Sequence, residues 1–181
     1  MSTTLSKSVL SKYKNDIFVE TGTLWGEAVE VAIECGFKKI YTVDIDPKKV
    51  EHSRKKFSKE IKTGQVEVLE GDTFKIFPDM IKKVDAPATF WFDAHWDGGP
   101  MGDYKCPLPF ELEALLSHPI KTHTLLVDDR RLFGQVGSNW GENLDEELLI
   151  EAMTDINSNY KISFEDGCVS DDIIVAKLDE I

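Results

Sequence analysis

Short apolar stretches with strand character alternate with helical stretches along the first 130 residues of the chain. The strand-like segments cover residues 16–20, 38–44, 65–72, 88–93 and 122–129, and the helical segments between them cover 25–36, 46–61, 73–84 and 109–118. Helices of this size between strands indicate right-handed βαβ units and a mostly parallel sheet. The alternation therefore predicts an α/β fold.

The C-terminal part of the chain changes character. A helix is predicted over 145–157, followed by two strand-like segments at 160–167 and 171–178 that a short glycine-containing link joins. This pattern is typical of an antiparallel hairpin. Together the segments predict a Rossmann-like, mostly parallel seven-stranded sheet with helices on both faces and a C-terminal antiparallel hairpin. We expect a single domain over residues 1–181, in which residues 1–15 form an N-terminal helical extension.

Charge and cysteine content limit the partners and the compartment. The chain has 33 acidic residues against 21 Lys plus Arg, a net charge of -12, which argues against nucleic acid or an anionic membrane as a partner. Three cysteines without CxxC spacing fit a reducing cytoplasm. No apolar run approaches the roughly 20 residues that span a bilayer, and the first 16 residues lack a signal-peptide core. The oligomeric state stays open, a homodimer included.

An acidic residue ends each of the five predicted parallel strands. In an open parallel sheet, ligands bind beyond the carboxyl ends of the strands, so these side chains are expected to share one edge. Taken singly, Asp44 and Asp72 could equally be helix caps, Asp93 could be a turn residue, and Asp128-Asp129 could be the start of a solvated loop. The acids are Glu20, Asp44, Asp72, Asp93 and Asp128, the last followed directly by Asp129.

The first three acids suggest a nucleoside ligand. The segment "VETGTLWGEA" places glycines around the first strand-to-helix turn, but Leu24 stands where a G-x-G-x-x-G fingerprint needs its middle glycine, which disfavours a dinucleotide. Asp44, at the end of the second strand, can accept hydrogen bonds from ribose hydroxyls. Asp72 can meet an adenine amino group. Ribose and adenine contacts without a pyrophosphate cradle fit S-adenosylmethionine.

The order of these elements resembles the class I S-adenosylmethionine-dependent methyltransferases. The resemblance lies in E-x-G-x-x-x-G, an acid closing strand two and Gly-Asp after strand three, and the C-terminal hairpin is also the family's usual ending. Within that class, Glu20-x-Gly22-x-x-x-Gly26 is similar to the looser glycine pattern of the metal-dependent O-methyltransferases. The resemblance covers nearly the whole chain after about residue 16. It implies S-adenosylmethionine as cofactor, bound by Glu20, Gly22, Thr23, Gly26, Asp44, Asp72 and Asp93.

The remaining acids suggest a divalent metal. Three carboxylates and waters suit Mg²⁺, with Mn²⁺ as the other candidate, and no Cys/His cluster points to zinc. Catechol-type and macrocin-type sugar O-methyltransferases have a similar arrangement, with an Asp after strand four and an acid pair after strand five. This resemblance implies that Asp93, Asp128 and Asp129 are the metal ligands.

The segment "FWFDAHWDGG" carries the candidate catalytic residues, Asp93 and His95. It resembles the Asp-His-Trp segment of the catechol enzymes with Ala94 inserted, but Asp97 stands where those enzymes have a lysine base. We therefore interpret His95 as the candidate base, because its unperturbed pKa lies near neutral pH. A hydrogen-bonded structural histidine is the alternative interpretation.

These features predict an S-adenosylmethionine-dependent and divalent-metal-dependent O-methyltransferase. The expected acceptor is a hydroxyl of a small molecule or of a sugar or glycan, because vicinal hydroxyls can chelate a metal. Two alternatives on the same fold are a non-catalytic cofactor-binding domain and a metal-dependent hydrolase.

Overall fold

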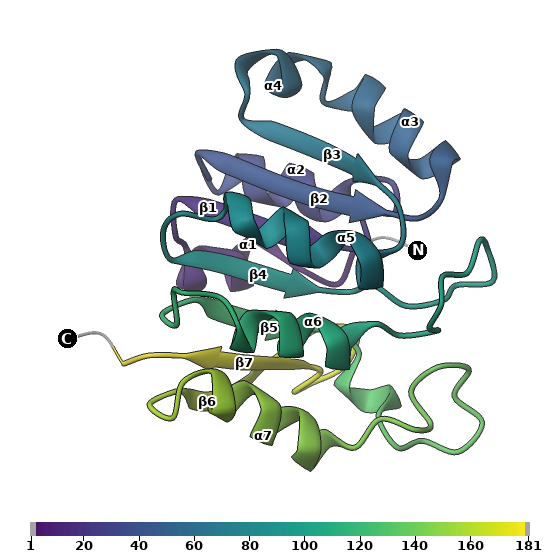
Figure 1. Cartoon of the computed structure of the whole chain (residues 1–181), viewed down its shortest axis with the longest axis vertical. Helices are drawn as coiled ribbons and strands as arrows, with labels where there is room; N and C mark the ends of the chain where they lie inside the picture. Colours follow the sequence, from purple (N-terminus) through teal and green to yellow (C-terminus); the bar gives the residue numbers. More distant parts are fainter. Residues whose placement is uncertain (1–2, 180–181) are drawn as a thin grey trace.

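The computed structural model describes residues 3–179, which form a single seven-stranded sheet in the order β3-β2-β1-β4-β5-β7-β6 (Figure 1). The first five strands pair in parallel, and β7 lies antiparallel between β5 and β6. The predicted fold class, including the C-terminal antiparallel hairpin, is confirmed. The strands are β1 Ile17–Thr21, β2 Lys39–Asp44, β3 Val66–Glu70, β4 Ala88–Phe92, β5 Thr124–Val127, β6 Lys161–Glu165 and β7 Ile173–Lys177.

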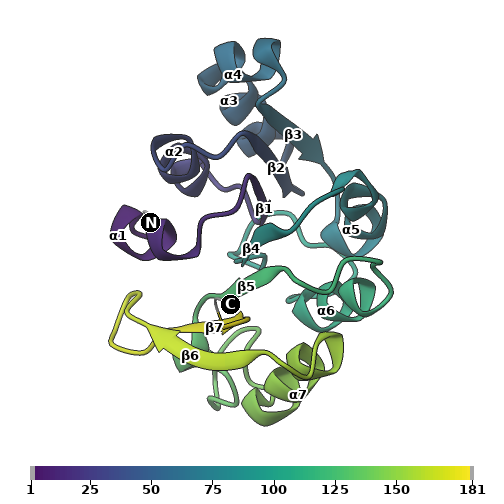
Figure 2. The same cartoon turned by 90° about the vertical axis from the view of Figure 1, so that its left-hand side faces the viewer.

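Helices cover both faces of the sheet. Figure 2 shows α1 and α2 on one side and α5, α6 and α7 on the other. The short α1 and a following 3-10 turn (Ser11–Tyr13) precede β1; residues 1 and 2 of the predicted extension lie outside the described residues. The helices are α1 Lys7–Leu10, α2 Glu27–Glu34, α3 Pro47–Lys56, α4 Ser58–Thr63, α5 Thr73–Met80, α6 Leu108–Leu116 and α7 Glu146–Ile156.

Two predicted helices differ in detail from those observed. The segment 46–61 is two helices, because the chain leaves helical geometry at Phe57, whose ring packs into the core at 3% exposure. Pro78 lies inside α5, which ends at Met80 and tightens into a 3-10 turn over Ile81–Lys83. A proline removes one backbone donor and crowds the preceding turn, so a short helix that changes type soon after it is the physical outcome.

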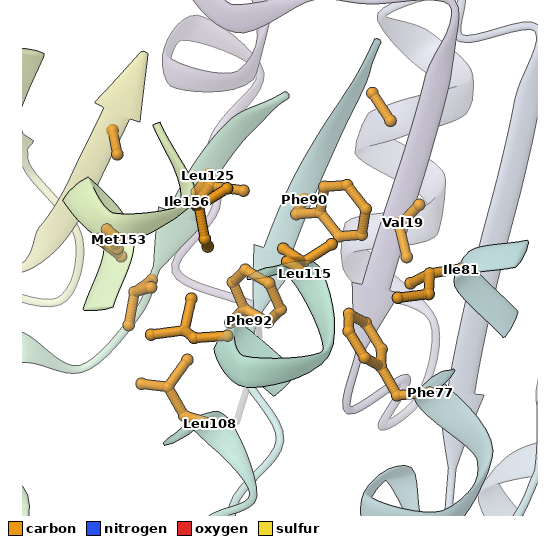
Figure 3. Close-up of a cluster of buried hydrophobic side chains, with 14 of the residues drawn as sticks. Val19, Phe77, Ile81, Phe90, Phe92, Leu108, Leu115, Leu125, Met153 and Ile156 are labelled. Carbon is orange, nitrogen blue, oxygen red and sulfur yellow. The ribbon is translucent and has the colours of Figure 1, made fainter. Parts of the chain in front are cut away.

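The segment "ATFWF" forms the central strand β4, and its central position explains why it carries no charged side chain. All five of its residues are buried, because helices cover the sheet on both faces. Phe90 and Phe92 pack with Phe77 against the α5, α6 and α7 side (Figure 3), whereas Trp91 belongs to the core on the other side. Packing of these large side chains fixes the position in the sheet at which β4 ends and Asp93 follows.

The strand register aligns the carboxyl ends of the central strands. Thr21 pairs with Phe92, and Phe92 pairs with Val127, so the residues that follow these strands emerge at one edge. The arrowheads of β2, β3 and β4 point to the same side in Figure 1, where two long loops project, residues 93–107 and 133–145. Within residues 3–179, no helix combines the length and the apolar character needed to cross a membrane.

Candidate functional site

Asp93 and Asp128 both leave the sheet at this edge on continuing backbone hydrogen bonds. The amide of Asp93 donates to the carbonyl of Thr21 at 3.1 Å, and the amide of Asp128 donates to the carbonyl of Phe92 at 3.1 Å. The parallel ladder thus extends one residue past each strand. This places the acids after β4 and β5 next to each other, as the sequence predicted for a common edge.

Asp93, His95 and Asp129 form one cluster of side chains, in which His95 lies between the two carboxylates. The Nε2 atom of His95 lies 3.6 Å from Oδ1 of Asp93 and 3.2 Å from Oδ2 of Asp129. Ligand-capable atoms of the three residues all lie within 4.8 Å of one another. Asp129 has a left-handed backbone (φ 62°, ψ 29°), which is unusual for a residue other than glycine.

Asp128 belongs to a second group, with Asp129 and Asp172, whose carboxylates also lie within 4.8 Å. The carboxylates of this second group already have hydrogen-bond and ion-pair partners within the protein. The hydroxyl of Thr4 donates to Asp128, and Arg131 forms ion pairs with Asp172 and, at 2.7 Å, with Asp129. The structure therefore divides the predicted metal set, Asp93, Asp128 and Asp129, between two groups that share Asp129.

Crowding of carboxylates changes the pKa values at this edge. Burial raises the pKa of Asp93 well above its ordinary value, and the nearby charges of Asp128 and Asp129 raise it further. Burial and the charge of Asp129 raise the pKa of Asp128 to about 6. Burial acts in the same direction on Asp129, but His95 and Arg131 outweigh it and hold the pKa of that carboxyl below its usual range. A cation beside Asp93 would relieve this repulsion, so the donor set fits a divalent metal.

The turn between β1 and α2 is closely packed and held by buried hydrogen bonds. Glu20 is 1% exposed, accepts a 2.5 Å hydrogen bond from Thr42, and has its pKa raised to about 8 by burial. The hydroxyls of Thr42 and Thr23 are also 2.5 Å apart. Gly22 has φ +88°, and a Cβ there would lie 2.6 Å from the carbonyl oxygen of Asp93. The turn after β1 is thus held directly against the start of the loop after β4.

Gly26 is also required by packing within the protein. Its φ is +79°, and a Cβ there would lie 2.5 Å from the ring of Phe57. Backbone conformation and close packing therefore explain why both positions of the motif are glycine in this fold. A role in the approach of a cofactor to the backbone stays a prediction for Gly22, Thr23 and Gly26.

Asp44 and Asp72 lie at the adjoining part of the edge and accept backbone hydrogen bonds. Asp44, 7% exposed, accepts from the amides of Leu24 and Asp46, both at 2.8 Å, and so joins the turns after β1 and β2. Asp72 is the N-cap of α5 and accepts from the amide of Phe74 at 3.1 Å. A carboxylate accepts about four hydrogen bonds, so each retains capacity for the hydroxyl or amino groups of a nucleoside.

The loop of residues 93–107 crosses the edge beside both of these acids. Lys49 of α3 forms a 2.6 Å ion pair with Asp97, and the Lys49 side chain is only 12% exposed. The amide of Asp103 donates to Asp72 at 2.8 Å, and Lys75 of α5 lies 3.0 Å from Asp103. These contacts hold the loop across the part of the edge where the sequence predicts the adenosyl group.

A small hollow beside Asp93 contains a residue that the sequence interpretation missed, Glu111. Apolar and aromatic side chains line the hollow together with Asp93, His95, Cys106 and Asp128. Glu111, on α6, is 1% exposed, and neither of its carboxylate oxygens has a hydrogen-bond partner of ordinary geometry among residues 3–179. Burial raises the pKa of the Glu111 carboxyl to about 8, opposed by the hydroxyls of Thr73 and Thr21. Its position within the amphipathic "PFELEALL" gave no sign that it faces inward.

Comparison with known proteins defines the fold. No protein-family model and no curated protein sequence matches the chain. Among solved structures, it is similar to the methyltransferase PaMTH1 of Podospora anserina bound to S-adenosylhomocysteine (16% identity, TM-score 0.61, 96% of this chain and 76% of that chain). It is also similar to the Bacillus cereus O-methyltransferase in complex with S-adenosylhomocysteine (13%, 0.60, 96% and 78%). A third is the O-methyltransferase TomG of Streptomyces achromogenes, involved in tomaymycin synthesis, in complex with S-adenosylmethionine (14%, 0.57, 96% and 78%).

These similarities extend over nearly the whole chain, whereas the identities are low. The chain therefore has the fold of the class I S-adenosylmethionine-dependent methyltransferases, as the sequence resemblance implied. Fold similarity of this kind leaves the site residues to be argued from their own geometry.

Proposed function

We propose that the protein is an S-adenosylmethionine-dependent O-methyltransferase that uses a divalent metal. The observation that carries the proposal is the single edge at which Glu20, Asp44 and Asp72 adjoin the Asp93 group, on a fold shared with cofactor-bound methyltransferases. Neither alternative, a non-catalytic binding domain or a metal-dependent hydrolase, has an observation that favours it over methyl transfer.

Three acids of the edge are assigned to cofactor binding. Asp44 and Asp72 hold the ribose and adenine groups through their remaining acceptor capacity, and buried Glu20 lies beneath the turn that faces the rest of the cofactor. When bound, the cofactor supplies a methyl group on a positively charged sulfur. The many carboxylates nearby favour binding of that cation.

The neighbouring acids are assigned to the acceptor. Asp93 and Asp129 provide oxygen donors for a divalent metal, which when bound would lower the pKa of an acceptor hydroxyl. Aromatic side chains of the two long loops, Trp96 and Trp140, offer surfaces on which a sugar or phenol ring can stack. A vicinal diol on a small molecule or a sugar is the acceptor class that fits such a site, because both oxygens can reach one metal.

The cofactor assignment is tested by calorimetric titration with S-adenosylmethionine. Asp44→Asn is expected to weaken binding at least about tenfold, because a charged hydrogen-bond acceptor is lost. Asp16→Asn is the matched control, since Asp16 is an exposed acid paired with Lys38 at the opposite end of β1. Equal affinity of both variants and the wild type, with unchanged thermal melting, would show that Asp44 does not contact the cofactor.

A further inference from the structure

We infer that His95 is a metal ligand together with Asp93 and Asp129, and that the site therefore selects Mn²⁺ or a similar transition metal over Mg²⁺. The inference rests on the proposed metal dependence of this edge and specifies the donor set. It replaces the role of general base that the sequence suggested for His95. It also leaves Asp128 outside the set of direct ligands.

The position of the imidazole is the first argument. Nε2 of His95 points between the two carboxylates, at 3.6 Å from Asp93 and 3.2 Å from Asp129. A nitrogen that faces two carboxylates is aimed at the place where a cation would be held, and not at an acceptor hydroxyl. The other ring nitrogen, Nδ1, is buried and has no hydrogen-bond partner among the described residues.

The occupancy of the second acid group is the next argument. Arg131 already provides the positive charge between Asp129 and Asp172, and Thr4 donates to Asp128. A metal in that group would have to displace a guanidinium. Among the described residues, no Lys or Arg pairs with Asp93 in the other group. The side chains of Asp93 and His95 are each 23% exposed, so an ion can reach them.

An independent observation indicates that a polar ligand belongs in the adjoining hollow. Glu111 lines the hollow with Asp93 and His95 and is 1% exposed, and within residues 3–179 neither of its carboxyl oxygens has a hydrogen-bond partner. A buried carboxyl group without a hydrogen-bond partner is unfavourable, in either protonation state, unless a ligand or water pairs with it. Water on a metal, or a hydroxyl brought by an acceptor, is the kind of donor that this position would meet.

The donor types decide the choice of metal. Mg²⁺ binds almost only oxygen and keeps several of its waters, whereas Mn²⁺, Fe²⁺, Co²⁺ and Zn²⁺ also accept imidazole nitrogen. One imidazole with two carboxylates is therefore a mixed donor set that a transition metal prefers. The stacking of His95 on Trp140, with ring centroids 4.4 Å apart, holds the ring in this orientation.

The test is a titration of the full chain with Mn²⁺ alone, followed by electron paramagnetic resonance. We expect one Mn²⁺ per chain, nitrogen coupling from one imidazole in pulsed spectra, and retention of Mn²⁺ in a hundredfold excess of Mg²⁺. His95→Gln should abolish the nitrogen coupling and weaken Mn²⁺ binding about tenfold or more, by analogy with losses of metal-site residues. Asp128→Asn removes a nearby negative charge but no ligand, so it should keep the nitrogen coupling and weaken Mn²⁺ binding clearly less than His95→Gln does.

Three results would overturn the inference: bound Mn²⁺ without nitrogen coupling, a loss of affinity in Asp128→Asn as large as in His95→Gln, or no Mn²⁺ binding at millimolar concentration. Circular dichroism and thermal melting of both variants separate these results from misfolding. Because S-adenosylmethionine is left out, failure here is distinct from failure of the proposed methyl transfer, which the cofactor titration tests separately.

Discussion

The imidazole of His95 stacks on the indole of Trp140, with ring centroids 4.4 Å apart and ring planes inclined by 15°. This contact joins the loop after β4 to the loop of residues 133–145, and it orients the nitrogen that faces Asp93 and Asp129. Trp140 in turn contacts Phe133 edge-on at 6.2 Å, which anchors the second loop. Two loops far apart in sequence thus fix one side chain of the candidate metal site.

Removal of this stacking should loosen the metal site without removing a ligand. Trp140→Ala is expected to weaken Mn²⁺ binding about tenfold, because residues that orient a ligand typically change metal affinity by that amount or more. Trp140→Phe keeps an aromatic face and should stay close to the wild type. The measurement is the Mn²⁺ titration, and equal affinity in the alanine variant would show that Trp140 does not position His95.

The loop of residues 93–107, which crosses the sheet edge beside Asp44 and Asp72, should slow entry of S-adenosylmethionine. Asp97→Asn removes the ion pair with Lys49 and is expected to raise the association rate several-fold in stopped-flow fluorescence. A single ion pair near the surface contributes about 1 kcal/mol or less, so thermal stability should change little. Glu51→Gln, which removes the exposed ion pair with Lys55 on the same helix, is the control and should leave the rate unchanged. An unchanged rate in Asp97→Asn would mean that the loop does not limit entry.

Gly22 should be the most sensitive glycine of the edge. Gly22→Ala combines a left-handed backbone with a Cβ 2.6 Å from the carbonyl of Asp93, so the loss of stability should exceed about 3 kcal/mol. Gly64→Ala separates the two effects, since Gly64 has φ +79° and open space around it; about 1 kcal/mol is expected there. Urea unfolding measures both, and similar losses would refute the close approach of the first turn to Asp93.

A buried histidine pair predicts a pH dependence of stability far from the site. Nδ1 of His123 accepts from the amide of Ala88, and its Nε2 lies 3.1 Å from Nδ1 of His118. Burial, helped by electrostatic repulsion from His118 and Lys121, lowers the pKa of His123 from 6.5 to about 4. The folded state favours the neutral ring, so its stability contribution is complete above pH 6.5 and is lost as the pH falls towards 4.

The magnitude follows from the two pKa values. Between pH 7.5 and pH 5 the wild type should lose about 2 kcal/mol that His123→Gln does not lose, because glutamine cannot titrate. Urea unfolding of both proteins at the two pH values gives this difference directly, and the shared contributions of other groups cancel. A difference near zero would indicate that His123 titrates normally in the folded protein.

The sheet could be predicted from sequence because its signals are local and repeated. "ATFWF" must be buried on both faces, and the helices between the strands leave few ways to connect them. The carboxyl edge was predictable for the same reason, since Asp93 and Asp128 follow directly from where β4 and β5 end.

Side-chain partners at the edge could not be predicted, since they depend on loop conformations. The contact of Thr4 with Asp128 joins residues that are 124 positions apart in the chain. The left-handed backbone of Asp129 and the burial of Glu111 have no signal in the residues around them. Asp72 is an example of a residue whose role the sequence alone could not decide. The sequence allowed either a helix cap or cofactor binding. The structure shows that Asp72 caps α5, and this role does not exclude cofactor binding.

Calorimetric titration with S-adenosylmethionine before and after removal of divalent metal by a strong chelator, paired with a methyl-transfer assay on a vicinal diol, tests the central claim most directly. We predict that the cofactor binds with similar affinity in both states, because Asp44 and Asp72 lie in a different part of the edge from the Asp93 group, and that transfer occurs only with metal. Absence of cofactor binding in both states, or transfer that the chelator does not affect, would contradict the account.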